Sequence, residues 1–181
     1  MRENKEDWKN LSDKELADRT LDQNKEYFEE LVNRYYPKLF RYLHRLLNHD
    51  EHGVEECLSE TFLKAYLNLS TYSPRAPFSA WLYRIAHNQA VDHLRRGAHR
   101  ATIEMKEEHL TVDPLPLYED KDYIEHILGQ LSIEDRNLLT LYYLEELTLY
   151  EISDILKIKP NTIAVRIKRI RERLRKDNPS S

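Results

Sequence analysis

A C-terminal segment that begins at Thr148 constrains the fold more than any other part of this sequence. Residues 149–156 are a short amphipathic stretch that Thr148 can cap, and Glu151 occupies the capping-box position three residues later. Residues 157–159 suffice only for a tight turn, and Pro160 suits the first position of a second helix, where no backbone N–H is needed. Two short helices joined in this way predict a helix-turn-helix.

The second helix of this pair has two contrasting faces. With about 100° of rotation per residue, its apolar residues form one narrow stripe that must pack inward. They are Ile163, Ile167, Ile170 and Leu174. Early residues of a recognition helix face base edges, whereas later basic residues hold phosphates. The side chains expected to contact DNA are therefore Asn161, Thr162, Val165, Arg166, Lys168, Arg169 and Arg171.

Within this set, the residues opposite the apolar stripe are the ones expected to reach bases: Asn161, Val165, Lys168 and Arg169. Val165 can meet a thymine methyl group. A basic helix near a C-terminus also complements its own dipole without any ligand. The preceding helix, the turn and Pro160 favour DNA binding over this simpler interpretation.

The charges of the chain are distributed unevenly. The net charge is −4, which by itself argues against nucleic-acid binding. However, residues 157–176 hold nine lysines or arginines and one acid, whereas residues 104–125 hold eight acids and two lysines. This separation predicts one nucleic-acid face and a separate protein-binding face.

The remaining sequence is typical of a helical protein. Only three glycines occur, β-branched runs are nearly absent, and Leu, Glu, Lys, Arg and Tyr dominate. The first helix is expected to start at the cap Ser12. Apolar spacing predicts further helices across 22–48, which Pro37 either kinks or divides, across 54–69 and across 78–96.

Residues 98–118 lack a sustained period and contain Pro114 and Pro116, which indicates a linker. Four shorter helices are expected after it, near 119–130, 132–145, 148–156 and 160–176. The fold class expected is therefore all-α. It comprises two small helical domains, 1–97 and 119–177, joined by the flexible linker 98–118.

Several functional classes are excluded by what the sequence lacks. Cys57 is the only cysteine, so an internal disulfide is impossible. No apolar run is long enough for a signal peptide or a membrane span, which predicts a cytoplasmic protein. No phosphate-binding glycine loop or nucleophile elbow suggests an enzyme, and no cofactor is expected. His49 and His52 lie near Cys57 but flank a polar turn, so no metal site is expected.

The segment 78–96 mixes aromatic and basic side chains behind a loop with two prolines. Trp81, Tyr83 and Arg84 could stack on and clamp unpaired bases. Trp81 and Ile85 also fit an ordinary apolar core. Spacing alone leaves both interpretations open.

Four segments resemble the extracytoplasmic-function sigma factors of the sigma-70 family: residues 28–35, 54–66, 78–96 and 147–173. They follow the order and spacing of that family and cover both expected domains. The most specific is the run Ala-Trp-Leu-Tyr-Arg-Ile-Ala-His-Asn at residues 80–88. The resemblance implies a non-enzymatic factor that carries RNA polymerase to particular promoters.

The resemblance implies a role for each segment. The helix within 54–66 is similar to the one that binds the clamp coiled coil of the largest polymerase subunit. Its implied contact residues are Glu55, Glu56, Ser59, Glu60 and Phe62. Loop 70–77 and the helix after it are similar to the part that captures the melted −10 element. The DNA contacts implied there are Arg84, Asn88, Arg95 and Arg96. The helix-turn-helix is similar to the reader of the −35 element.

The partners implied by the resemblance are the RNA polymerase core, contacted at its clamp coiled coil and flap, promoter DNA, and an anti-sigma factor. Some residues depart from the family pattern. Ser59 replaces a usual glutamine, Glu56 stands where aspartate is common, and Ala164 replaces a frequent basic residue. The promoter sequence therefore does not follow from the resemblance. His87 occupies a variable family position and receives no role.

Two other functions remain open. A stand-alone helix-turn-helix regulator would bind duplex DNA by itself, usually as a dimer with a self-complementary apolar surface. It would leave the segments 55–62 and 81–96 unexplained. An interaction protein with the same fold would bind regulators without initiating transcription, and the basic face of residues 161–176 argues against it.

Overall fold

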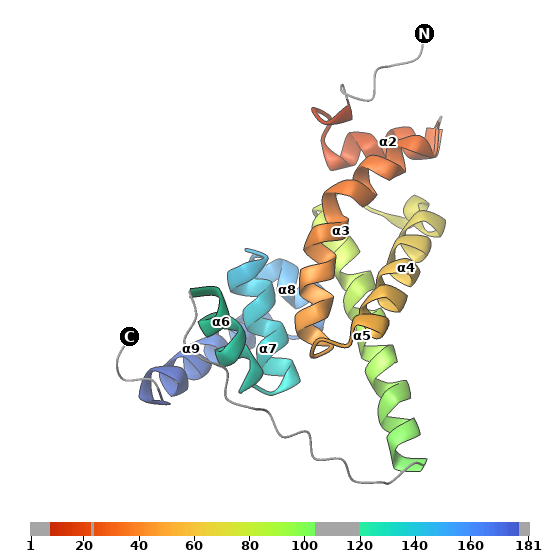
Figure 1. The fold of residues 1–181 in the computed structure, drawn as a ribbon. Coiled ribbons are helices and arrows are strands. Elements are labelled where there is room, and N and C mark those ends of the chain that lie inside the picture. Colours follow the sequence, from red (N-terminus) through yellow and green to blue (C-terminus); the bar gives the residue numbers. More distant parts are fainter. Residues whose placement is uncertain (1–7, 23, 104–119, 178–181) are drawn as a thin grey trace.

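The computed structural model describes residues 8–22, 24–103 and 120–177, and it is built from helices (Figure 1). Their bounds are α2 (Asp13–Asp22), α3 (Glu26–Leu46), α4 (Glu51–Leu67), the 3₁₀ turn η1 (Leu69–Thr71), α5 (Phe78–Ile103), α6 (Asp120–Gly129), α7 (Ile133–Leu139), the π-helical turn η2 (Thr140–Leu144), α8 (Leu149–Leu156) and α9 (Pro160–Asp177). No strand occurs in these ranges, and the all-α prediction is confirmed.

Helices α2 to α5 form the first group around a shared apolar core. Leu31, Leu39 and Leu43 line the inner face of α3, where Leu58 of α4 and Leu82 of α5 are equally buried. At the predicted start of α2, the Ser12 N–H donates to Glu15 and the Glu15 N–H donates to Ser12. This reciprocal pair is the expected capping box.

Two boundaries in this group differ from the sequence-based expectation. α3 continues past Pro37 as one helix, so the alternative of two helices was wrong. α5 continues to Ile103, through residues 98–103 of the expected linker. No proline interrupts that stretch, and Ala98, Arg100 and Ala101 are good helix formers. Because the stretch has no apolar stripe, periodicity could not indicate this extension.

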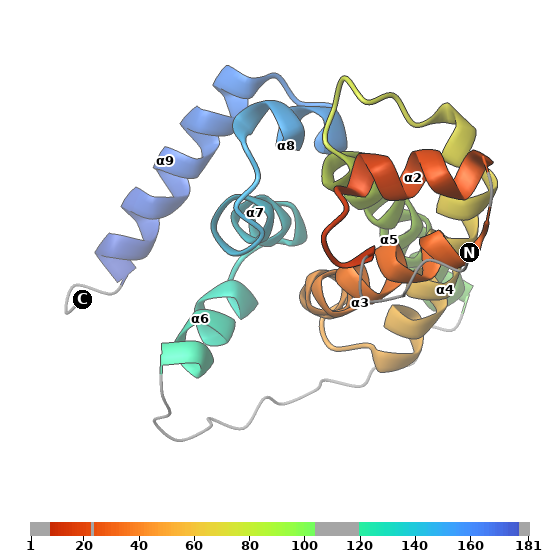
Figure 2. The same ribbon diagram turned by 90° about the horizontal axis from the view of Figure 1, so that it is seen from above.

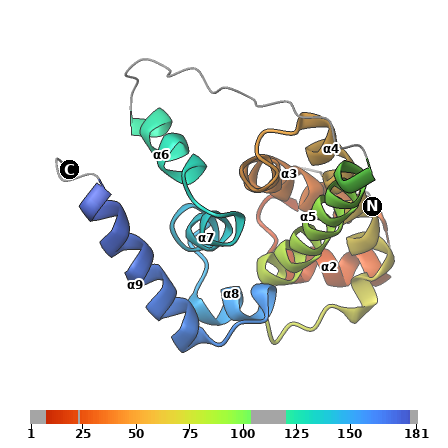
Figure 3. The ribbon, with the colours of Figure 1, turned by 90° about the horizontal axis from the view of Figure 1, so that it is seen from below.

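Helices α6 to α9 form the second group. Their core contains Leu138 and Leu141 from the α7–η2 segment, Ile152 and Ile155 from α8, and Ile163 from α9. Seen from below, α8 and α9 lie on one side of α7 and α6 on the other (Figure 3). All four helices expected here are present, with ends shifted by a few residues.

The two groups pack against each other. α7 lies beside α3, and α8 lies beside α5 (Figure 2). At this boundary Tyr42 Oη donates to Asn137 Oδ1 over 2.9 Å, and Asn137 Nδ2 lies 3.2 Å from Nδ1 of His87. Tyr42 and Asn137 are buried, so their hydrogen bonds are shielded from water.

Two further contacts lie at the edges of the same boundary. Arg45 Nε donates to Glu125 Oε1 over 2.8 Å, and the Tyr83 hydroxyl donates to the Glu145 carboxylate. Glu145 directly follows the π-helical turn η2, in which its N–H bonds back to Thr140 O. The sequence predicted a tether between two domains but no interface between them.

Acidification is expected to weaken this interface. Burial lowers the pKa of His87 below its ordinary value of 6.5. An open or unfolded chain therefore binds more protons than the closed one as the pH falls from 7, and stability falls with it. The measurement is thermal unfolding between pH 7 and pH 5 for the wild type and His87→Gln. We expect a flatter pH dependence for His87→Gln, because the other histidines, including half-buried His44, whose pKa is also lowered by burial, remain in both proteins. Equal pH slopes would contradict the assignment.

Candidate nucleic-acid and polymerase interfaces

The recognition helix α9 has the two faces that its sequence predicts. Ile163, Ile167 and Ile170 are buried and Leu174 is half-buried against the core of the second group. Six of the seven residues expected to contact DNA are exposed: Asn161, Thr162, Val165, Lys168, Arg169 and Arg171. α9 therefore presents a polar and largely basic surface on the side opposite its buried stripe.

The geometry of α8 and its turn fixes the direction of α9. The Thr148 N–H donates to Glu151 Oε2 over 2.8 Å, and the Glu151 N–H donates back to Thr148 Oγ1 over 3.3 Å. Lys157 caps the end of α8, and its left-handed backbone (φ 59°) lets its N–H bond to Ser153 O. α9 then begins at Pro160. The predicted capping box, turn and proline start are all confirmed.

Arg166 differs from the other predicted DNA contacts. Its Nε donates to Asp135 Oδ1 of α7 over 2.7 Å, and Arg173 donates to the second carboxylate oxygen over 3.2 Å. The guanidinium of Arg166 thus lies against the body of the domain. Helical spacing placed Arg166 on the flank of α9 but could not reveal its partner on another helix.

Tyr150 is a candidate DNA contact that the sequence analysis missed. It lies in the first turn of α8 and is 77% exposed, although it belongs to an amphipathic helix. In a helix-turn-helix the first helix crosses the phosphate backbone. Tyr150 could have been recognised from the sequence as an aromatic residue on the polar side of this helix.

The outer face of α4 carries the residues expected to bind polymerase. Ser59 and Glu60 are exposed, and Glu55 accepts a hydrogen bond from the Tyr36 hydroxyl over 3.2 Å. Phe62 is half-buried and stacks on the Tyr36 ring with their planes only 9° apart. These four residues and Tyr36 form a mixed acidic and aromatic surface.

Glu56 is the exception on this helix. Its carboxylate binds Arg96 over 2.9 Å and lies 3.4 Å from His93, both on α5. A predicted polymerase contact and a predicted DNA contact are therefore paired with each other. Both side chains are more than a third exposed, so the pair contributes little to stability.

Next to this surface, α4 exposes three large apolar side chains that the sequence analysis did not assign. Leu63 is 52%, Tyr66 41% and Leu67 67% exposed. Exposed apolar residues grouped on one helix are typical of a protein-binding surface. These residues could have been found from the sequence, because they are apolar but lie outside the predicted buried stripe of this helix.

The close approach of α4 and α5 depends on Gly53. A Cβ atom there would lie 2.4 Å from Asp50 Oδ2 and 2.6 Å from His93 Nε2. Asp50 accepts from the Gly53 N–H over 3.0 Å and contacts His93 over 3.1 Å. The hydrogen bond from Gly53 is the main cause of the lowered pKa of Asp50. This contact sets the spacing between the predicted polymerase and DNA surfaces.

The predicted −10 contacts on α5 share one side of the helix. With about 100° per residue, Arg84, Asn88 and Arg95 lie within about 40° of one another. Asn88 and Arg95 are exposed and Arg84 is partly exposed, whereas Arg96 lies on the Glu56 side. One side of the helix thus carries an amide and two guanidinium groups.

Trp81 belongs to the core and is not a free stacking platform. It is 7% exposed and lies in an aromatic cluster with Tyr72 and Phe78, with ring centroids about 5.5 Å apart. Spacing left open whether Trp81 stacks on bases or packs in the core, and the structure shows that it packs in the core. The cluster anchors the loop before α5 to the helix itself.

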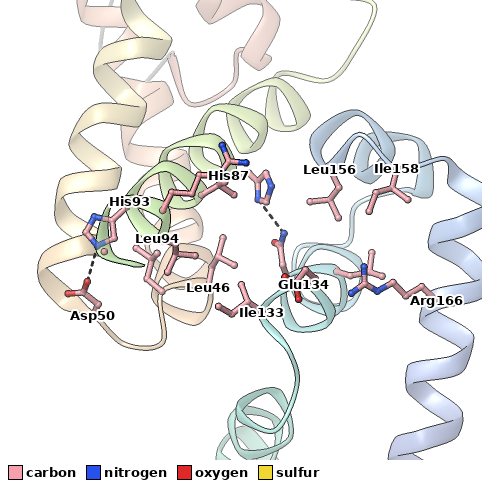
Figure 4. A pocket seen from close by; sticks show the side chains of 16 residues that line it. Leu46, Asp50, His87, His93, Leu94, Ile133, Glu134, Leu156, Ile158 and Arg166 are labelled. Atoms are coloured by element: carbon pink, nitrogen blue, oxygen red, sulfur yellow. Dashed lines mark hydrogen bonds and ion pairs between the residues drawn. The ribbon is translucent and has the colours of Figure 1, made fainter. Parts of the chain in front are cut away.

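A largely apolar cavity of about 750 Å³ lies between the two helix groups (Figure 4). Leu46 and Leu94 line it from the first group, and Ile133, Leu156 and Ile158 from the second. Ile158, in the turn between α8 and α9, packs partly against the core and also faces this cavity. The interface is therefore incompletely packed. Separating the two groups would expose less additional apolar surface to water than separating a fully packed interface would.

Within the described residues, no helix is long and apolar enough to cross a lipid bilayer. The same residues contain no cluster of three His, Cys, Asp or Glu side chains that could hold a metal ion. The Cys57 thiol is buried, which raises its pKa to about 11. It is thus a core residue and a poor nucleophile at neutral pH.

Comparison with known families supports this arrangement. A family model for Sigma-70 region 2 matches residues 31–100, and one for Sigma-70 region 4 matches residues 121–174. The fold and these two matches define a two-region factor of the sigma-70 class. Among curated relatives, the ECF RNA polymerase sigma factor SigW of Bacillus subtilis is 31% identical, covering 82% of this chain and 87% of the relative. The ECF factor SigM of the same species is 28% identical, with coverages of 81% and 92%. The chain belongs to the extracytoplasmic-function sigma factors.

Solved structures show the same fold. CnrH in complex with the cytosolic domain of CnrY matches with a TM-score of 0.68 and 24% identity, covering 93% of this chain and 99% of that chain. The sigma factor RpoE of Bartonella quintana, in complex with the anti-sigma factor NepR, gives a TM-score of 0.68 and 20% identity, covering 82% and 94%. At these identities the likeness concerns the fold alone.

Proposed function

We propose that this sigma factor divides promoter recognition and polymerase binding between two domains, residues 1–97 and 119–177, joined by 98–118. The second domain reads the duplex −35 element. The helix-turn-helix with its exposed basic face on α9 is the observation that carries this proposal. Bases are contacted by Asn161, Val165, Lys168 and Arg169, and Thr162 and Arg171 hold neighbouring phosphates. Tyr150 adds a phosphate contact from α8.

The first domain binds the polymerase core and the melted −10 element. The acidic and aromatic surface of α4, including Ser59, Glu60 and Phe62, suits a basic coiled-coil partner, and its exposed apolar residues extend that surface. On α5, Asn88 can hydrogen-bond the edge of an extruded base while Arg84 and Arg95 hold the strand. The factor works in the cytoplasm, where the polymerase is found, and has no catalytic activity of its own.

Promoter binding requires the two domains to separate. Elements centred near −10 and −35 lie roughly 25 base pairs apart, about 85 Å along B-form DNA at about 3.4 Å per pair. A folded unit the size of α6–α9 is only roughly 30 Å across. Here the helix that carries Asn88 touches the second domain through His87 and Asn137. The incompletely packed cavity supports a contact that opens on the polymerase.

An anti-sigma factor is a further partner. CnrH and RpoE, which share this fold, were each solved with a bound partner, the cytosolic domain of CnrY and the anti-sigma factor NepR. We infer that an anti-sigma factor also binds this chain and holds it inactive. Binding to both domains at once would keep them from separating.

Reversing the charge of Glu60 is expected to weaken binding to core polymerase. An exposed acid at the centre of the α4 surface faces a basic partner, so Glu60→Lys places like charges together and should raise Kd at least about tenfold. The measurement is a titration of labelled protein with sigma-free core polymerase. Asp18→Lys, an equally exposed acid on α2, is the matched control. Equal losses in both variants, or none in Glu60→Lys, would reject α4 as the polymerase surface.

A further inference from the structure

Asp135 is a buried acid outside the proposed DNA and polymerase contacts. It lies in the first turn of α7 and is 9% exposed. A buried carboxylate is costly unless charged or hydrogen-bonding partners compensate it. Its partners are two arginines of the recognition helix, with Arg166 Nε at 2.7 Å from one oxygen and Arg173 Nη2 at 3.2 Å from the other.

This geometry fixes the recognition helix in two directions. Arg166 and Arg173 are seven residues apart, which is close to two helical turns, so they lie one above the other on the same side of α9. One carboxylate that holds both resists rotation of α9 about its axis and sliding along it. Asp135 is itself fixed, because its backbone N–H donates to Ser132 Oγ over 3.2 Å at the start of α7.

The same contact decides which cations remain available to DNA. Side-chain exposure is 36% for Arg166 and 53% for Arg173, but 78% for Lys168 on the outer face. A cation already neutralised by a carboxylate does not take up a phosphate charge or release counterions from DNA. Lys168 lies 3.9 Å from Glu172, but both side chains are exposed, so this pair is weak and screened by salt. Asp135 therefore leaves binding to the outer residues that contact bases, such as Lys168, and limits attraction to DNA of any sequence.

We propose that Asp135 is a positioning residue that sets the orientation of α9 and withholds Arg166 and Arg173 from the phosphate backbone. The proposal rests on the proposed function of α9 as the DNA-reading helix. It predicts that Asp135 increases the preference for the promoter over other DNA, because sequence-independent affinity comes from phosphate contacts.

The test uses polymerase reconstituted with the full chain and two duplex fragments, a promoter recovered by selection and the same fragment with its −35 region shuffled. Binding is measured from 50 to 200 mM salt for the wild type, Asp135→Asn, Arg166→Gln and Arg171→Gln, the last at an exposed arginine assigned to a phosphate. Phosphate contacts made by the polymerase are common to all four and cancel in the comparison. Thermal unfolding of each free protein checks that the variants fold.

A phosphate contact contributes about 0.9 to the slope of log K against log salt. Arg171→Gln should therefore make this negative slope shallower by about 1, whereas Arg166→Gln should leave it unchanged. Asp135→Asn frees Arg166 and Arg173 to bind phosphates and should therefore steepen the slope by about 1 to 2. The ratio of the affinity for the promoter to that for the shuffled fragment should fall severalfold. A merely structural Asp135 would weaken both fragments at an unchanged slope.

Two results would overturn the proposal. If Arg166→Gln and Arg171→Gln make the slope shallower by the same amount, Arg166 reaches phosphate and Asp135 does not withhold it. If all four proteins give one slope and no preference for the promoter, α9 does not read DNA, and the proposed function fails together with this inference.

Discussion

Replacing both Lys168 and Arg169 by alanine is expected to abolish most promoter-dependent transcription while leaving polymerase binding intact. Both side chains are exposed on the outer face of α9, away from its buried isoleucines. A good base contact contributes about 1–3 kcal/mol of discrimination, and loss of a phosphate contact weakens binding further. Together the two changes should cost about 2–4 kcal/mol, which corresponds to roughly 30- to 700-fold in promoter affinity.

The measurement is run-off transcription from a selected promoter, with core binding assayed in parallel. The matched control replaces two exposed lysines of the first domain, Lys14 and Lys25, by alanine, which removes the same charge far from α9. Similar losses in both double variants would point to a nonspecific charge effect. Loss of core binding in the α9 variant would show that this helix has a different role.

Replacing Arg136 by alanine is expected to have the largest effect on stability. Arg136 is 8% exposed, and its guanidinium donates to the carbonyl oxygens of three residues at the end of α6 and in the turn after it. These are Leu128 at 2.8 Å, Gly129 at 3.3 Å and Leu131 at 3.5 Å. It also reaches across to the end of α3, where it donates to Arg45 O, and to the turn that follows, where it donates to Asn48 Oδ1 over 3.1 Å. Burial lowers the pKa of Arg136, but the ordinary pKa of arginine is so high that the side chain stays charged.

Alanine would leave the buried carbonyl groups of Leu128 and Leu131, and partly buried ones at Gly129 and Arg45, without this donor. Unsatisfied buried polar groups cost about 1–3 kcal/mol each, so we expect a loss of about 2–4 kcal/mol in the free energy of unfolding. The measurement is urea denaturation. Arg136→Lys is the informative control, because it keeps the charge but not the planar fork of donors and should recover only part of the loss. Full recovery by lysine would mean that charge alone matters at this site.

The helix-turn-helix could be predicted in detail because its signals are local. Thr148, Glu151 and Pro160 each act within one turn of their own position, and the isoleucine stripe of α9 needs only a constant helical period. The same holds for the capping box at Ser12 and the outward side of α4. The class of fold and the surface of α9 followed from these residues.

The remainder depends on pairs that are distant in the sequence. Arg166 and Asp135 are 31 residues apart, and Tyr42 and Asn137 are 95 residues apart. Neither the partner of Arg166 nor the interface between the domains leaves a periodic pattern in one segment. The extension of α5 to Ile103 was missed for a different reason, since residues 98–103 carry no apolar stripe that periodicity could detect.

Transcription by a sigma-free bacterial core polymerase, supplied with this protein and a pool of random upstream sequences, tests the proposed function most directly. Sequencing the transcripts locates the start sites, and Asn88→Ala and Lys168→Ala variants are run alongside. We predict that the protein co-elutes with the core and creates new start sites that share upstream motifs near −10 and −35. Asn88→Ala should weaken selection at the first motif and Lys168→Ala at the second. Failure to bind the core, combined with tight binding of the free protein to duplex DNA, would contradict the sigma-factor function and identify a stand-alone regulator instead.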